Sequence, residues 1–122
     1  MKVLKLEPRE HPKELEITDS LESMQSIVGG MIQVVYPFED TVALICNEEG
    51  ELLDLPYNRA LRTPDTNQIY DIICGTCFLC GAPEDSDTFT SLTKEQLEHY
   101  KEYFWKPEFF LKSNGNIVVL KL

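Results

Sequence analysis

Three of the four cysteines lie in one apolar stretch, and this stretch is the part of the sequence that most suggests chemistry. Cys74, Cys77 and Cys80 have the spacing C-x-x-C-x-x-C, and the fourth cysteine is Cys46. A structural zinc ion usually needs two such pairs, or three cysteines and a histidine, on flexible loops. In a strand, Cys77 would point to one face and Cys80 to the other, so three thiolates would not reach one ion. We therefore expect a strand of buried thiols with no metal or other cofactor, and a structural metal is the alternative.

Acid–base catalysis lacks a clear candidate residue. His11 precedes a proline in a predicted loop, and His99 lies among glutamates in a predicted helix, so both are expected at the surface. The motifs of serine hydrolases, zinc proteases and nucleotide-binding loops do not occur in the sequence. We predict no catalytic residue, and the sequence favours a protein that is not an enzyme.

A polar segment in the middle of the chain offers a different kind of site. Residues 56–68, PYNRALRTPDTNQ, contain two prolines and are predicted to form a long loop. Asn58 and Arg59 lie between apolar residues in this loop, and a guanidinium can bind a phosphate or a carboxylate. The alternative is that Arg59 anchors the loop by pairing with one of the many acidic residues.

The charge distribution points to the kind of partner. The chain has 21 Asp and Glu against 11 Lys and Arg, a net charge of -10, and ten acids but no Lys or Arg occur from Glu14 to Asn58. Such a charge disfavours binding to nucleic acid, which needs a basic face. Segregated acids favour a basic protein partner, and the alternative is simply a solvated acidic surface.

A candidate partner surface follows from these acids and from a late cluster of aromatic residues. We expect five acids at the turns of a meander, all at one end of the sheet: Glu39, Asp40, Glu48, Glu49 and Glu51. Residues 100–110 hold six aromatic side chains; some must belong to the core, and the others, around Trp105, are predicted to form an exposed strip.

The elements that would position these residues indicate an α+β fold. Strands are predicted at 2–8, as an edge strand, at 31–55, as a three-stranded meander with Gly50 at positive φ, at 68–81, as one long strand, and at 117–122. Helices are predicted from a cap at Asp19 to Gly29, and from a Thr93–Gln96 capping box to Pro107. We expect residues 1–122 to form a single domain with a mostly antiparallel sheet of about five strands and two helices packed against it.

The amino-terminal sequence and the apolar runs suggest a compartment. MKVLKLEPREHP lacks the apolar segment of a secretory signal, and no apolar run is long enough to cross a bilayer. We therefore expect a cytoplasmic protein that does not bind membranes, whose thiols are kept reduced.

Four segments resemble a known family. IVGGMIQVV, NEEGELLDLPYNRAL, YDIICGTCFLCGAP and SLTKEQLEHYKEYF, in this order, are similar to the family described as domain of unknown function 3846, over roughly residues 21–111. The resemblance implies that Cys74 and Cys77 replace an alanine or an aromatic residue on a strand, which agrees with the absence of a metal. It implies a source in phages, plasmids or conjugative elements, and no assigned activity.

Two functions are compatible with the sequence. The first is a non-enzymatic interaction protein of a phage or mobile element that binds a host or element-encoded protein with a basic surface, such as a nucleic-acid-processing or defence enzyme. The second is a small-ligand or anion-binding domain, or a minor enzyme, that uses the 56–68 loop with Asn58 and Arg59. The oligomeric state does not follow from the sequence.

Overall fold

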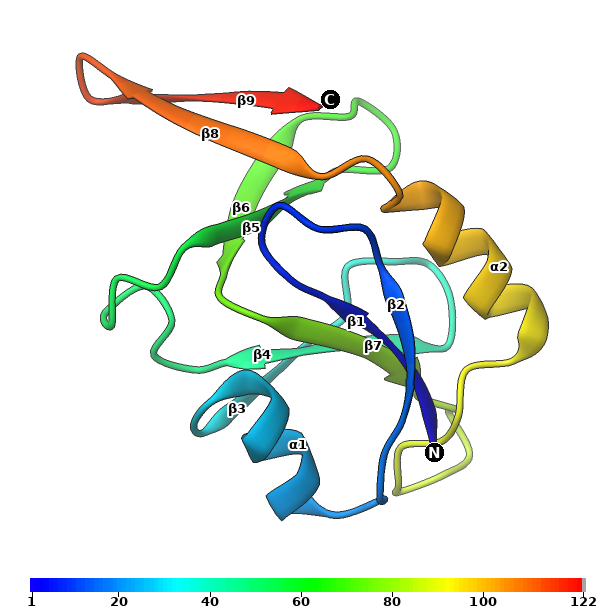
Figure 1. Ribbon diagram of the computed structural model, residues 1–122. Coiled ribbons are helices and arrows are strands. Elements are labelled where there is room, and N and C mark those ends of the chain that lie inside the picture. The colour runs from blue at the N-terminus through cyan, green and yellow to red at the C-terminus, as the bar shows by residue number, and fades with distance from the viewer. Residues whose placement is uncertain (122) are drawn as a thin grey trace.

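The computed structural model describes residues 1–121 as nine strands and two helices (Figure 1). The strands are β1 (Lys2–Leu6), β2 (Lys13–Glu16), β3 (Ile32–Val35), β4 (Val42–Asn47), β5 (Tyr57–Arg62), β6 (Ile69–Cys74), β7 (Cys77–Gly81), β8 (Glu108–Ser113) and β9 (Asn116–Lys121). The helices are α1 (Leu21–Val28) and α2 (Lys94–Tyr103). Neither helix has the length and apolar character needed to span a membrane.

Five strands form the central sheet in the order β2-β1-β7-β4-β3, and every neighbouring pair is antiparallel. The predicted α+β class, with a mostly antiparallel five-stranded sheet and two helices, is confirmed. The prediction that the first strand lies at an edge is wrong, because β2 pairs with the outer side of β1 and β7 with its inner side. The remaining strands form two separate hairpins, β5–β6 and β8–β9.

The central sheet is covered on both faces, which explains why all six residues of β4 are buried. On one face, Ile45 and Phe78 pack with Met24 and Val28 of α1. On the other face, Leu44 and Leu79 belong to a cluster completed by α2 and by the β5–β6 hairpin. Alternate side chains of β4 and β7 therefore point into the two cores on opposite faces of the sheet.

Local signals set the helix ends. Ser20, and not the predicted Asp19, caps α1 by accepting a hydrogen bond from the Ser23 amide, and Gly29 ends this helix with a φ of 80°. The predicted capping box of α2 is confirmed, with Thr93 and Gln96 each bonding to the other's backbone.

The cysteine-rich segment is two strands and not one. Gly75 has a φ of 83°, and this left-handed turn separates β6, in the β5–β6 hairpin, from β7, at the centre of the main sheet. The third strand beside β3 and β4 is therefore β7, while residues 48–54 form turns. Residues 56–68 are not the predicted long loop, since β5 occupies Tyr57–Arg62 and only a turn joins it to β6.

Gly50 has a steric role and not the predicted positive φ, which belongs to Asp54 instead. A Cβ atom at Gly50 would lie 2.7 Å from the carbonyl oxygen of Cys74. Because this oxygen belongs to the backbone at the end of β6, it has little freedom to move away. Close approach of two backbone segments is therefore the reason for glycine here.

We expect Gly50→Ala to lower the free energy of unfolding by about 1–3 kcal/mol, as overpacked sites do. An alanine that met no obstruction at an ordinary φ would instead raise it by about 0.4–1 kcal/mol, so the sign of the change in urea unfolding decides the matter. Gly115→Ala is the comparison: Gly115 has a φ of 81° and no atom within 4 Å of the added Cβ, so only the backbone cost applies.

Candidate functional site

Strand β5 carries Asn58 and Arg59 into the interior, where their exposed fractions are 0% and 1%. The Asn58 side-chain amide donates hydrogen bonds of 2.8 Å to the carbonyls of Leu6 and of Gly75. It therefore connects the end of β1 to the turn between β6 and β7.

The Arg59 guanidinium is surrounded by oxygen acceptors of the protein itself. Its Nη1 donates to Asn58 Oδ1 at 2.8 Å, and its Nη2 donates to the Glu10 carbonyl at 2.7 Å and to the Phe104 carbonyl at 3.3 Å. Burial lowers the pKa of Arg59, while the nearby Cys77 and Glu108 act in the opposite direction. Arg59 is an anchor, as one alternative held, but its partners are backbone carbonyls and the Asn58 side chain, and not the expected acids.

Glu108 is a second buried charge, which the sequence analysis missed. It is 1% exposed, accepts a hydrogen bond of 2.6 Å from the Ala60 amide and forms a 2.6 Å ion pair with Arg62. The signal in the sequence was a single acid inside WKPEFFLK, where every other charge is a lysine. Glu108 attaches the β8–β9 hairpin to β5.

The four thiols are buried and free, and they do not all lie in one part of the fold. Cys77 and Cys80 lie in opposite cores, as their alternation predicted, while Cys74 ends β6 in the separate hairpin. Burial raises the pKa of Cys46 to about 11 and that of Cys80 to about 12, and it also raises the pKa values of Cys74 and Cys77. Over residues 1–121, no three or more His, Cys, Asp or Glu side chains gather in a way that could hold a metal ion. At neutral pH these thiols are protonated and weakly nucleophilic.

The five predicted acids do not share one end of the sheet, so that prediction is wrong. Glu39 and Asp40 precede β4, whereas Glu48, Glu49 and Glu51 follow it, which separates the groups by about 20 Å along a six-residue strand. The two turns flank the same strand, and the two ends of a strand lie at opposite ends of its sheet, whichever strand follows.

The Asp40 side chain has a structural role. Its carboxylate accepts hydrogen bonds from the Tyr100 hydroxyl at 2.8 Å and from Gln96 at 3.2 Å, and so ties the loop before β4 to α2. Partial burial raises the pKa of Asp40, but the hydrogen bonds from Tyr100, the Thr41 amide and Gln96 outweigh burial and lower it. A partner would find only part of this carboxylate free.

Residues 48–55, which we call the acidic turn, combine charge with exposed apolar surface. Leu52 is 86% exposed and Leu53 is 54% exposed. Four exposed acids surround them in the sequence: Glu48, Glu49, Glu51 and Asp54. Asp71 of β6 adds a fifth, since it lines one small surface depression together with Glu48 and Glu51.

The acidic turn is held in one conformation despite its exposure. The Leu53 amide donates to the Glu49 carbonyl at 2.8 Å, and the Leu55 amide donates to the Gly50 carbonyl at 3.0 Å. Gly50 approaches β6 closely, and Leu55 packs on the bare backbone of Gly75, where a Cβ would lie 2.7 Å from its Cδ1. The two leucines are therefore presented by an ordered scaffold.

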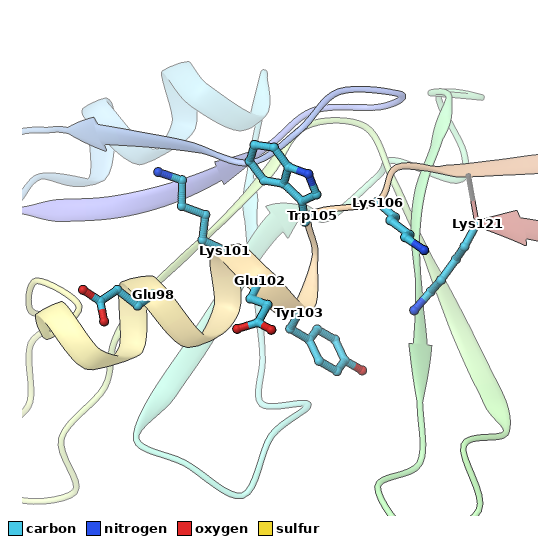
Figure 2. A pocket seen from close by; sticks show the side chains of 7 residues that line it. All are labelled: Glu98, Lys101, Glu102, Tyr103, Trp105, Lys106 and Lys121. Atoms are coloured by element: carbon cyan, nitrogen blue, oxygen red, sulfur yellow. The ribbon is translucent and has the colours of Figure 1, made fainter.

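The predicted aromatic strip divides between the core and a groove. Tyr100 and Phe104 are buried, while Tyr103 and Trp105 are 43% and 46% exposed. The exposed pair borders a groove of about 560 Å³ between α2 and the β8–β9 hairpin (Figure 2). The other residues that line this Trp105 groove are Glu98, Lys101, Glu102, Lys106 and Lys121.

The Trp105 groove has a stacked aromatic pair on one side and two lysines at one end. The indole of Trp105 stacks on the His11 ring with centroids 4.0 Å apart. Figure 2 shows the Lys106 and Lys121 side chains converging toward each other, and Lys121 Nζ lies 5.7 Å from the centre of the Tyr103 ring. Partial burial, followed by the positive charges of Arg62, Arg59 and Lys106, lowers the pKa of Lys121, while Glu108 opposes this shift.

The surface part of residues 56–68 is the turn at 63–68, which borders a separate pocket of about 440 Å³. Arg62 also lines this pocket, but its guanidinium is paired with Glu108. Glu39 and Asp40 add negative charge there. An anion would therefore find less free positive charge in this pocket than in the Trp105 groove.

We expect Arg59→Ala to cost about 3 kcal/mol or more in urea unfolding, because the buried Asn58 Oδ1 and the buried Phe104 carbonyl would both lose a donor. Arg59→Lys should also destabilise, since an ammonium cannot reproduce the planar fork. Lys94→Ala, at an exposed lysine, is the control and should leave the free energy of unfolding within about 0.5 kcal/mol. Full stability of Arg59→Ala would contradict the anchor role.

Comparison with known proteins identifies the family and nothing more specific. The family model described as Domain of unknown function (DUF3846) matches residues 1–105. The match begins earlier than the resemblance in the sequence suggested, and it ends before the β8–β9 hairpin. No curated protein and no solved structure matches the chain. The acidic turn and Trp105 lie inside the matched region, and the chain belongs to the DUF3846 family.

Proposed function

We propose that this protein is a non-enzymatic interaction module and that the acidic turn is its binding surface. The observation that carries the proposal is the exposure of Leu52, at 86%, on an ordered turn surrounded by acids. Burying a leucine in a partner gains roughly 1.5–3 kcal/mol. Together with the adjacent Leu53, Leu52 forms an apolar patch rimmed by acids, and such patches mark interaction sites.

The chemistry of the acidic turn defines the partner. Leu52 and Leu53 fit an apolar pocket, and the acids around them fit a rim of lysines and arginines, because opposite potentials accelerate association and fix its orientation. The ordered backbone avoids the entropic cost of arranging the turn on binding. A nucleic-acid-processing or defence enzyme has such a basic surface, where it normally holds phosphates.

The wider setting is part of the same proposal. A mobile element that encodes this protein would use it in the cytoplasm, where host enzymes with basic grooves are found. The net charge of -10 supports this role, since a protein with that charge is attracted to basic surfaces over several ångströms of solvent.

The test uses the partner recovered with the full chain from the source organism. Glu48→Lys/Glu49→Lys/Glu51→Lys should slow association by about tenfold or more, and added salt should weaken the wild-type complex, because the Debye length is about 8 Å at physiological ionic strength. Leu52→Ala should act mainly by accelerating dissociation.

A matched control separates the acidic turn from net charge. Glu84→Lys/Asp85→Lys/Asp87→Lys makes the same change in charge on another exposed loop and should alter association much less. Equal effects of the two triple variants, or a complex indifferent to both salt and Leu52→Ala, would reject the acidic turn as the interface.

A second candidate function is anion binding in the Trp105 groove, in place of the site that the sequence suggested at Asn58 and Arg59. Lys106 and Lys121 form no ion pair within residues 1–121, and Lys121 already lies among positive charges. A bound anion would relieve this repulsion, and Tyr103 and Trp105 would pack against a flat ring. The groove suits a small molecule that carries a planar ring and a phosphate or carboxylate.

Trp105 is the only tryptophan in the chain, so its fluorescence reports on this groove. We expect AMP to change the emission of Trp105 and to bind more tightly than adenosine or inorganic phosphate. Adenosine supplies only the ring that packs against the aromatic side chains, and phosphate supplies only the anion that binds the lysines. Lys106→Ala/Lys121→Ala should weaken AMP binding about tenfold or more, a loss of about 1.4 kcal/mol. Lys94→Ala should leave it unchanged, and equal binding by the double lysine variant would exclude this function.

A further inference from the structure

The β8–β9 hairpin has two faces of different chemistry. Its pairing is regular, without a bulge, and joins Phe109 to Leu120, and Leu111 to Val118. Because directly opposed residues share a face, these four apolar side chains form what we call the outer face. The inner face consists of Glu108, Phe110, Lys112, Ile117, Val119 and Lys121.

The inner face makes the contacts with the body of the protein. Glu108 binds Arg62 and the Ala60 amide, and Phe110 packs against Tyr57 at 5.3 Å between ring centroids. Lys112 lies over the same Tyr57 ring, and Lys121 over that of Tyr103. Most of the outer face is therefore directed away from the body, and the hairpin extends from the rest of the molecule (Figure 1). Phe109, at the base of the hairpin, is the exception, since it is half-buried and lines a pocket with Arg9 and Pro56.

This arrangement reverses the usual one, in which the apolar face of a sheet is turned inward. Leu111, Val118 and Leu120 are 56%, 45% and 43% exposed on the outer face. A two-stranded hairpin is marginal in water unless another layer covers its apolar face. An uncovered face of this kind marks an interaction site.

We propose that the outer face binds the outer face of a second copy of this chain, forming a symmetric dimer through a small β-sandwich. The outer face carries no charge, and Lys112 and Lys121 point to the inner side, so two copies meet there without like charges in contact. Residues 1–105 hold 20 acids and eight basic residues, whereas residues 106–122 hold three lysines and one glutamate. The hairpin is thus a segment of net positive charge that a second, strongly acidic copy can approach without repulsion.

The size of the face sets the strength of the dimer. Six-residue strands give the hairpin a length of about 20 Å, which exceeds the Debye length of about 8 Å and keeps the acidic bodies screened from each other. Two strands give a face of only about 10 Å in width, well below that of a permanent interface. We therefore expect a reversible equilibrium, with a Kd in the micromolar range or weaker.

The experiment is sedimentation equilibrium of the full chain at increasing concentration. We expect the mass to rise from the 14.0 kDa of one chain toward twice that value. Leu111→Lys/Val118→Lys should raise the Kd about tenfold or more, which corresponds to about 1.4 kcal/mol. Because these side chains are exposed in the monomer, the melting temperature should change little, which a thermal unfolding measurement verifies.

Ile117→Lys is the matched control, since Ile117 lies on the same strand and is 39% exposed but belongs to the inner face. It should leave the Kd within about threefold, a change of less than 1 kcal/mol. A protein that stays monomeric up to about 1 mM, the limit of weak association, would overturn the proposal. So would an equal loss of the dimer in Ile117→Lys.

Salt distinguishes this dimer from the complex of the acidic turn. Screening the acidic bodies should strengthen the dimer, whereas it should weaken an attraction between the acidic turn and a basic partner. A dimer that weakens as salt is added would contradict association through an uncharged face. Because the two salt effects have opposite signs, either proposal can fail without the other.

Discussion

The guanidinium of Arg59 joins parts of the chain that no strand pairing connects. Its hydrogen bonds reach the turn between β1 and β2, strand β5, and the carbonyl of Phe104 at the end of α2. Burying this cation is costly, and the cost is offset only because several acceptors surround it. The position of the β5–β6 hairpin under the central sheet, and that of the chain leaving α2, both depend on this set of contacts. Arg62 and Glu108 continue the connection into the β8–β9 hairpin.

Much of the fold could be predicted because its signals are local. The Thr93–Gln96 capping box, the glycine after α1 and the alternation within β4 and β7 depend on residues close in sequence. Apart from the cap of α1, the failures have one physical origin: local patterns were compatible with more than one strand arrangement, and long-range pairing selected among them. The two apolar runs around Gly75 are consistent with one long strand or with two, and tertiary packing, including that of Leu55 on this glycine, selects two.

The candidate sites were harder to predict than the fold for a related reason. A polar residue in a polar segment can be exposed or buried, and Asn58 and Arg59 are buried because distant carbonyls need donors. The prediction for the acids failed because the turns that carry them lie at the two opposite ends of β4. The sequence contains no direct sign that Leu52 is exposed or that the apolar face of the β8–β9 hairpin is turned outward, since both follow from tertiary packing.

The strand order of the central sheet has a consequence for how the chain folds. β1 and β2 form a local hairpin, and so do β3 and β4, but β7 lies between the two hairpins and connects them. Leu4 pairs with Leu79, which is 75 positions later, so closing this contact carries a large loop entropy and places the sheet among slowly folding topologies. During synthesis, an edge of β1 and an edge of β4 stay unpaired until the cysteine-bearing strand has left the ribosome. The nascent chain thus exposes two apolar strand edges for the time needed to make about 35 residues, a period in which it is open to chaperones and to aggregation.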